Sequence, residues 1–249
     1  MAALSPRLIS SAIPLRISRS PSAVLTRLVN WDVVIMAGYL WHQIRKQLWL
    51  GLTIVLSALS PMSHGAEPRV LVIGDSLSAA YGMALEQGWV NLLQQRISEK
   101  GYPHRVVNAS ISGDTTGGGA RRLPSLLSEH EPSVVIIELG GNDGLRAFPL
   151  KTMRGNLETM AALVTDSDAA LLILGAEAPP NLGNRYTSRF RDTFTEVAQT
   201  YGARQLPFII DRIFLDPDLM QSDNTHPNII AQPLLLDHVW PEIEPMLGK

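Results

Sequence analysis

The stretch that decides the fold is Val70-Leu71-Val72-Ile73-Gly74-Asp75-Ser76-Leu77-Ser78. Four consecutive aliphatic residues are typical of a strand that is buried on both faces, as in a parallel sheet. Gly74 lets the chain turn tightly, so Ser76 is expected just beyond the carboxyl end of this strand. Ligands of open α/β sheets bind at that edge. A serine there can act as a nucleophile if a base and oxyanion donors converge on it.

The composition limits the class of protein. The chain has 249 residues, 45% of them hydrophobic, with a net charge of -2 and no cysteine. This length suffices for one core of good size or for two small ones. The near-neutral charge argues against a nucleic-acid binder, which normally presents a basic face. The absence of cysteine excludes disulfides, thiolate metal sites and a cysteine nucleophile.

A secretory signal is predicted before the folded part of the chain. Arg45 and Lys46 precede an uncharged apolar run at 48–59, and small or helix-breaking residues follow it up to Ala66. The run is shorter than the roughly 20 residues of a membrane span. A signal peptide typically has a basic segment, a short apolar segment and then small residues at the cleavage site. We place this signal peptide at residues 36–66. An uncleaved membrane anchor is the alternative.

This assignment divides the chain into three parts. Residues 1–35 precede a signal of ordinary length that begins at Met36, so they are interpreted as a mis-assigned translation start or a disordered extension. Their Ser/Arg-rich, acid-poor composition also resembles an organellar transit peptide. Residues 67–249 are predicted to form a single domain, periplasmic or secreted, in a Gram-negative bacterium.

From Arg69 onward, strand and helix patterns alternate. Short runs rich in Val, Ile or Leu occupy residues 70–73, 105–107, 134–137, 170–174 and 206–210. Apolar residues recur at helical spacing over residues 89–97, 153–164 and 190–201. The alternation predicts one three-layer α/β/α sandwich around a five-stranded parallel sheet. A last apolar stripe within 229–247 contains Pro241 and Pro245, and because proline removes a helical hydrogen bond we expect that helix to kink or end near Trp240.

Two loops carry residues suited to an oxyanion hole. The loop at 108–119 contains Gly113, which could offer a free N–H. A phosphate-binding loop is the rival interpretation, but the Lys-Ser/Thr ending is missing, and a plain flexible turn is also possible. After the third strand, Asn142 could donate its side-chain N–H to an oxyanion. The alternative there is an Asn-Asp-Gly turn of structural origin.

A third loop contains an acid–imidazole pair. Asp223 and His226 stand three residues apart, followed by the rigid Pro227. The carboxylate would fix the tautomer of the ring and stabilise the imidazolium. The alternative is that Asp223 caps the next helix.

The order of these loops favours one common site. Ser76, Gly113 and Asn142 follow the first three strands, and the acid–imidazole pair follows the fifth. In a sheet of order 2-1-3-4-5 the order reverses between strands one and three, so Ser76 and Asn142 flank the switch point.

Four sequence blocks, in this order, resemble those of the GDSL/SGNH hydrolase family: Gly74-Asp75-Ser76-Leu77, Gly113, Gly140-Gly141-Asn142-Asp143 and Asp223-x-x-His226-Pro227. The resemblance covers nearly all of residues 69–249 and is strongest to bacterial periplasmic members that are thioesterases, lysophospholipases and arylesterases. Those members carry Gly-Ile where this chain has Asn224-Thr225. Because asparagine tolerates unusual backbone angles, we expect the turn to survive.

The resemblance implies the flavodoxin-like SGNH fold with the order 2-1-3-4-5, and a role for each matching residue. Ser76 would be the nucleophile, His226 the base and Asp223 its orienting partner. The oxyanion hole would combine the N–H groups of Ser76 and Gly113 with the side chain of Asn142.

The implied function is hydrolysis of fatty-acyl thioesters, lysophospholipids and simple aryl or alkyl esters, without a metal or organic cofactor. The expected partner is a small acyl ester or thioester rather than a nucleic acid, and we expect a monomer with no stable membrane anchor after signal cleavage. Leu145, Phe148 and Leu150 are predicted to line or cover an acyl-chain groove. A carbohydrate acetyl esterase of the same family and a binding module without chemistry are the alternatives.

Overall fold

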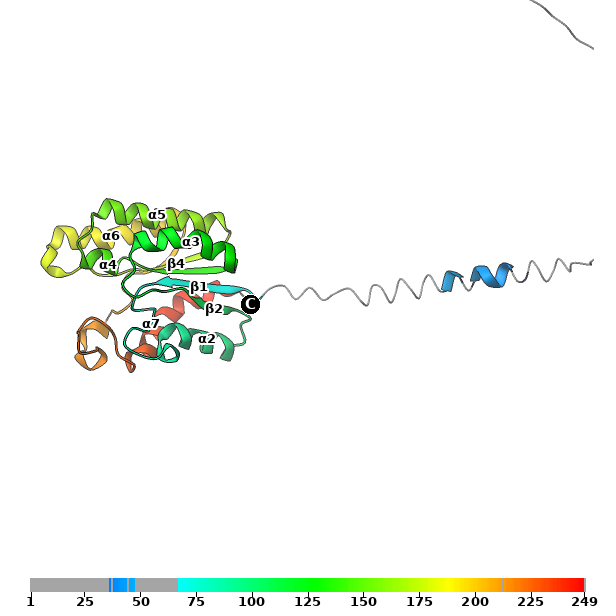
Figure 1. Cartoon of the computed structure of the whole chain (residues 1–249), viewed down its shortest axis with the longest axis horizontal. Coiled ribbons are helices and arrows are strands. Elements are labelled where there is room, and N and C mark those ends of the chain that lie inside the picture. Colours follow the sequence, from blue (N-terminus) through cyan, green and yellow to red (C-terminus); the bar gives the residue numbers. More distant parts are fainter. Residues whose placement is uncertain (1–35, 37, 44, 48–66, 212, 249) are drawn as a thin grey trace, which may run out of the picture. The chain divides into compact units, whose positions relative to one another are not determined.

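In a computed structural model of the chain, the described residues are 36, 38–43, 45–47, 67–211 and 213–248 (Figure 1). The described residues between 36 and 47 are helical. The predicted apolar run at 48–59, the rest of the signal segment up to residue 66 and residues 1–35 lie outside the described residues. Within the described part, no helix combines the length and the apolar character needed to cross a membrane.

The sheet has five parallel strands in the predicted order β2-β1-β3-β4-β5. They are β1 (Arg69–Gly74), β2 (Arg105–Asn108), β3 (Val134–Glu138), β4 (Ala170–Leu174) and β5 (Arg204–Leu206). The central strands β1 and β3 are buried along nearly their whole length, as the unbroken aliphatic runs predict. Their last register pair joins Gly74 to Glu138, so both strands end at the same level.

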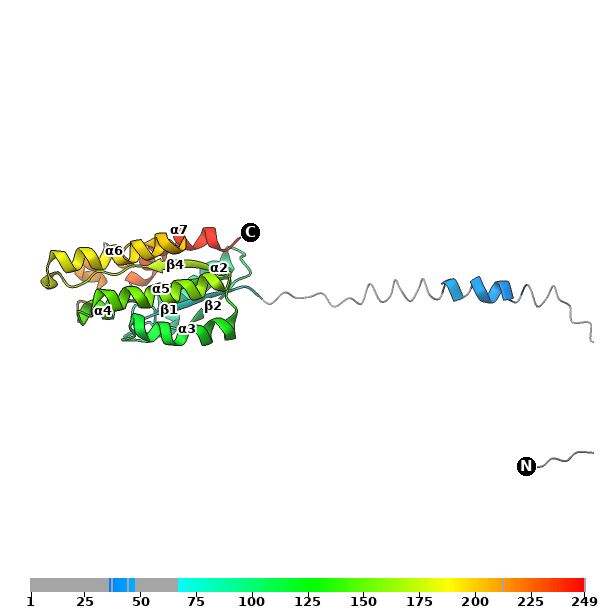
Figure 2. The ribbon, with the colours of Figure 1, turned by 90° about the horizontal axis from the view of Figure 1, so that it is seen from above.

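Helices cover both faces of the sheet. They are α2 (Trp89–Glu99), α3 (Thr116–His130), α4 (Gly141–Leu145), α5 (Leu150–Asp166), α6 (Asn184–Tyr201) and α7 (Ala231–Ile243). Short 3-10 turns complete the domain: η1 (Leu85–Gln87), η2 (Pro180–Leu182), η3 (Ile213–Leu215), η4 (Pro217–Leu219) and η5 (Glu244–Met246). Figure 1 shows α3, α5 and α6 over one face and α2 and α7 over the other. Seen from above, α5 lies between α3 and α6 and packs against both (Figure 2).

The alternation of side chains along β1 divides the core into two halves. Val70 and Val72 pack in the apolar cluster beneath α2 and α7. Leu71 and Ile73 pack in the cluster beneath α3, α5 and α6. Each aliphatic side chain of this strand is therefore buried, and the three-layer prediction is confirmed.

The fifth strand differs from its prediction at 206–210. It spans Arg204–Leu206 and stops before Pro207, which has no N–H to donate to a strand ladder. Ile209 and Ile210 are nevertheless buried in the half-core beneath α2 and α7. Their apolar character therefore reflects burial in a turn and not a strand.

Helix α3 was not predicted, because three glycines and Pro124 obscure its helical pattern. Thr115 caps its first turn by accepting a hydrogen bond from the N–H of Gly118. A Cβ atom on Gly119 would lie 2.3 Å from Leu139 Cδ1, so glycine permits the helix to approach the sheet closely. The glycines at 117–119 thus belong to a packed helix and not to a flexible turn.

Helix α7 does not end near Trp240. It continues through Pro241 to Ile243 and is followed directly by η5. Ile243 is fully buried and Trp240 nearly so. Burial of these side chains outweighs the one helical hydrogen bond that Pro241 cannot donate.

Candidate active site

A chain of two short hydrogen bonds joins the three residues predicted to react. Ser76 Oγ lies 2.9 Å from His226 Nε2. On the other side of the ring, His226 Nδ1 lies 2.7 Å from Asp223 Oδ2. Ser76 follows β1 and the other two residues lie between η4 and α7. The fold therefore brings together residues that are 150 positions apart in the chain.

The loop that carries His226 is closed by its own backbone. Met220 and Pro227 form an antiparallel bridge, and the N–H of Gln221 donates to the carbonyl of His226 at 2.7 Å. Asn224 occupies the left-handed region with a φ of +53°, as expected for the asparagine at this turn. The buried Gln232 of α7 donates to the carbonyl of Pro227 and accepts from the N–H of Trp89. The loop is thus fastened to both α7 and α2.

Asp223 is held as a carboxylate. Besides the ring of His226, its Oδ1 accepts from the N–H groups of His226 and Thr225 at 3.0 and 2.9 Å. These bonds, the ring bond first, lower the pKa of Asp223 from 3.8 to about 2. Asp223 does not cap the next helix, since α7 begins at Ala231.

The predicted oxyanion donors surround the same strand ends. Asn142 lies in α4, directly after β3, and its Nδ2 donates to Asp75 Oδ2 at 3.0 Å. Gly113 has a φ of +80°, which favours glycine, and its carbonyl accepts from Arg146 Nη2 at 3.2 Å. Within the described part of the chain, no hydrogen bond is found for the N–H of Ser76 or of Gly113. Their role as oxyanion donors stays a prediction.

Further bonds fix the loops that carry these donors. The N–H of Ile111 donates to the carbonyl of Gly74 at 3.0 Å, which ties the Gly113 loop to the end of β1. The buried carboxylate of Asp143 accepts from Thr116 Oγ1 at 2.6 Å and from the N–H of Thr116 at 2.9 Å. The helix that carries Asn142 is thereby locked against the start of α3.

Two buried carboxyl groups beneath the site were not predicted. Asp75 and Glu138 are 3% and 2% exposed, and Glu138 Oε2 accepts from the N–H of Asp75 and from Ser78 Oγ. Burial raises the pKa of both carboxyls, and raises that of Glu138 well above its usual range. The sequence signal was the acidic residue that ends an otherwise aliphatic strand, Val134–Glu138.

A small hollow adjoins the nucleophile. Its lining residues are Ser76, Leu77, Ala80, Tyr81, Met83, His226, Pro227 and Gln232. The ring of Tyr81 packs on the ring of His226 with centroids 4.4 Å apart. Tyr81 was not among the predicted site residues, because a single tyrosine in a turn carries no distinctive pattern.

The predicted acyl-groove residues do not line this hollow. Leu145 and Phe148 are exposed, at 59% and 38%. Leu150 begins α5 and packs partly buried against the half-core beneath α3, α5 and α6. A groove formed by these three side chains stays a prediction.

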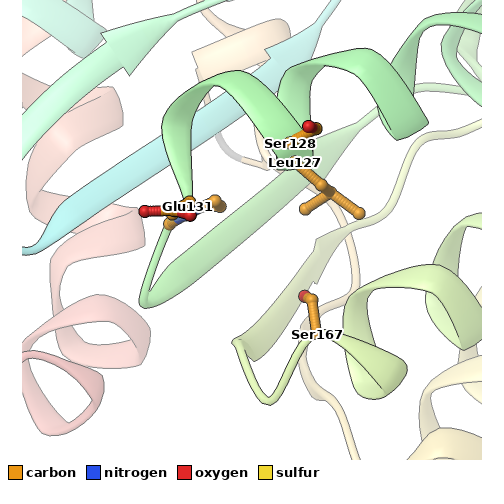
Figure 3. A pocket seen from close by; sticks show the side chains of 5 residues that line it. Leu127, Ser128, Glu131 and Ser167 are labelled. Carbon is orange, nitrogen blue, oxygen red and sulfur yellow. The ribbon is translucent and has the colours of Figure 1, made fainter.

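A second hollow, of about 450 Å³, lies at the opposite edge of the sheet (Figure 3). Leu127, Ser128 and Glu131 at the end of α3 face Ser167, which follows α5. None of the predicted site residues lines it. Across the described residues, no three His, Asp or Glu side chains gather as a set of metal ligands would.

The fold and the Ser-His-Asp arrangement define a serine hydrolase built on a doubly wound parallel sheet. The sequence pattern of the GDSL-like Lipase/Acylhydrolase family matches residues 72–230. This is more than half of the chain, so the chain belongs to that family.

Similar proteins agree with this assignment. Esterase TesA of Pseudomonas aeruginosa is 47% identical over 184 residues, which cover 74% of this chain and 92% of the relative. Thioesterase 1/protease 1/lysophospholipase L1 of Escherichia coli K12 is 38% identical over 74% of this chain and 86% of the relative. The crystal structure of the esterase EstA from Pseudoalteromonas, inhibited by monoethylphosphonate, matches with a TM-score of 0.70 and 42% identity over 73% of this chain and 99% of that chain. The chain is a serine ester hydrolase.

The pair of Asp223 and His226 predicts a simple pH profile. Since the pKa of Asp223 is about 2, its carboxylate stays ionised at all pH values above roughly 3. Its contribution to stability is complete above pH 3.8 and is lost only as the pH falls through about 2. The kcat/KM of ester hydrolysis should therefore show no loss from protonation of Asp223 at pH values above about 4. A midpoint for the Asp223 carboxyl at or above about pH 4, measured by NMR titration of its side-chain carbon, would contradict this account.

Proposed function

We propose that the chain hydrolyses carboxylic esters and thioesters in two steps through an acyl-enzyme on Ser76. The observation that carries the proposal is the unbroken hydrogen-bond chain from Ser76 Oγ through both nitrogens of His226 to Asp223. The carboxylate holds the ring in the tautomer whose Nε2 can accept a proton, and it stabilises the imidazolium that results.

In the first step, Ser76 Oγ attacks the carbonyl carbon while its proton passes to His226 Nε2. The negative charge that develops on the carbonyl oxygen is stabilised by the N–H groups of Ser76 and Gly113 and by Asn142 Nδ2. The imidazolium then gives its proton to the leaving alcohol or thiol as the bond to the acyl group breaks. In the second step, water attacks the acyl-enzyme, His226 accepts its proton, and the carboxylic acid leaves with Ser76 regenerated.

The proposed substrates are fatty-acyl thioesters, lysophospholipids and simple aryl or alkyl esters. The relatives named esterase and thioesterase 1/protease 1/lysophospholipase L1 support this range. The apolar side chains of Leu77, Ala80 and Met83 beside Ser76 suit an acyl chain better than a sugar. We further propose that Leu145 and Phe148, with Leu150 behind them, extend the path of a longer chain. The enzyme would act as a monomer on small molecules and without a metal or organic cofactor.

Export is proposed as well, with residues 36–66 as the signal and 67–249 as the mature domain in the periplasm or outside the cell. The basic pair Arg45 and Lys46 before an apolar run supports this division. Amino-terminal sequencing of the exported protein tests it. A mature chain that retains residue 1 would refute the division.

Replacing the nucleophile tests the mechanism directly. Ser76→Ala should abolish hydrolysis of p-nitrophenyl esters and labelling by a fluorophosphonate, without lowering the thermal unfolding temperature, because Ser76 is partly exposed. Ser128→Ala is the matched control, since it removes an exposed hydroxyl at the far edge of the sheet. Residual burst labelling in Ser76→Ala would place the nucleophile elsewhere.

The oxyanion hole is tested at Asn142. Asn142→Ala should lower kcat by roughly 10²–10³ and change KM little, because the lost donor acts mainly on the charge of the transition state. Turnover at the wild-type rate would remove Asn142 from the oxyanion hole.

A series of p-nitrophenyl esters from acetate to palmitate tests the substrate class. We expect kcat/KM to rise with chain length beyond acetate, and Phe148→Ala to weaken the preference for long chains by removing apolar surface that a bound acyl chain would cover. Phe214→Ala, which removes another exposed phenylalanine outside the Ser76 hollow, serves as the control. A preference for acetate would favour the acetyl esterase alternative, and an unchanged preference in Phe148→Ala would exclude the groove.

A further inference from the structure

Two carboxyl groups meet beneath the oxyanion hole with no cation between them. Glu138 ends β3 and Asp75 follows β1, and the N–H of Asp75 donates to Glu138 Oε2 at 3.2 Å, so the two buried side chains are neighbours. Neither has a lysine, arginine or histidine as an ion-pair partner among residues 67–211 and 213–248. The mechanism described above uses neither group. Burying carboxyl groups without an ion-pair partner costs folding free energy, so we expect this pair to have a function.

Two neighbouring carboxyls that are buried without a cation cannot both be ionised at low cost, so one of them carries a proton. The partners of each oxygen indicate which one. Asp75 accepts at both oxygens, from the N–H of Leu77 at Oδ1 and from Asn142 Nδ2 at Oδ2. Both bonds to Glu138 end on Oε2, which leaves Oε1 free for a proton. These partners favour Glu138 as the neutral acid and Asp75 as the carboxylate.

The surrounding charges favour the same assignment. The charge of Asp75 acts on Glu138 and opposes its ionisation, and the hydrogen bonds from Leu77 and Asn142 favour the ionisation of Asp75. Burial raises the pKa of Glu138 well above its usual range, and the bond from Ser78 only partly offsets this. A second negative charge at Glu138 would repel Asp75 and oppose the oxyanion nearby.

We propose that Glu138 is a positioning residue of the oxyanion hole: as a neutral acid it donates a hydrogen bond to Asp75 and so holds the Asp75 carboxylate against the amide of Asn142. One amide hydrogen of Asn142 is then bound by Asp75 while the other points to the substrate oxygen. Gly74 makes the arrangement possible, since a Cβ there would lie 2.8 Å from Glu138 Oε2. The inference rests on the proposed role of Asn142 in catalysis.

Infrared spectroscopy tests the proton without any assay of activity. The wild-type protein at pH 7 should show the C=O stretch of a protonated, buried carboxylic acid, and Glu138→Gln should lack it. No such band in the wild type would overturn the proposal. A band that persists in Glu138→Gln would place the proton on Asp75 and overturn it too.

Kinetics tests the positioning. Glu138→Met fills a similar volume without a donor and should lower kcat about tenfold with little change in KM, because an interaction with a charged acceptor is lost. Glu138→Gln, whose amide can donate to Asp75, should restore most of that loss. A glutamine variant as slow as the methionine variant, or a methionine variant as fast as the wild type, would overturn the proposal.

The failure of this inference differs from a failure of the proposed function. Fluorophosphonate labelling of wild-type Ser76 reports on the proposed nucleophile, whereas the infrared band reports on Glu138 alone. A labelled, active wild type without the band would refute only the role of Glu138. A wild type that shows the band but is never labelled would refute the proposed function and, with it, the role of Glu138 in catalysis.

Discussion

The parallel pairing of β1 with β3 is the constraint on which the active site depends. These are the central, most buried strands, and their register sets Gly74 opposite Glu138 at the carboxyl edge of the sheet. Ser76 lies two residues after the end of β1, and Asn142 lies four residues after the end of β3. The Gly113 loop is bonded to the carbonyl of Gly74. A slip in this register would displace Ser76 relative to Gly113 and Asn142, because the positions of all three residues are set by the ends of β1 and β3.

The two sides of the site are held by different means. The serine and the oxyanion donors rest on buried strands and on buried carboxyls, with Asp143 bound to Thr116 and Asp75 bound to Asn142. The base lies in a surface loop, where the side chain of Asp223 is 40% exposed. Gln232 fastens that loop to the core. Ser76 and the predicted oxyanion donors are therefore held by packing, whereas His226 depends on a few hydrogen bonds.

Much of this architecture could be predicted from the sequence. The unbroken aliphatic runs identify the buried strands, and the placement of polar residues after them predicts the edge where the site forms. The pairing of Asp223 with His226 and the left-handed Asn224 also follow from local chemistry. Helix α3 escaped prediction because its glycines serve close packing on Leu139, which only the tertiary structure shows. The end of β5 was also predicted wrongly, because the buried isoleucines after Pro207 give the sequence the apolar pattern of a strand.

The structure brings together the residues predicted to react, but it also gives them neighbours that were not predicted. Ser76, His226 and Asp223 stand in recognisable blocks, whereas Glu138 and Tyr81 contact partners far away in the chain. A lone acidic residue at the end of a strand does not reveal that it faces a second carboxyl. Such pairs emerge from the register of the sheet and from burial, neither of which a linear pattern contains.

The central claim is that four loops present one carbonyl with a hydroxyl, an imidazole and three N–H donors. A crystal structure of the protein after reaction with an alkylphosphonate tests it most directly. The account predicts phosphorus bonded to Ser76 Oγ, with the phosphonyl oxygen within hydrogen-bond distance of the N–H groups of Ser76 and Gly113 and of Asn142 Nδ2. Phosphorus on another residue, or a phosphonyl oxygen bound only by water, would contradict it.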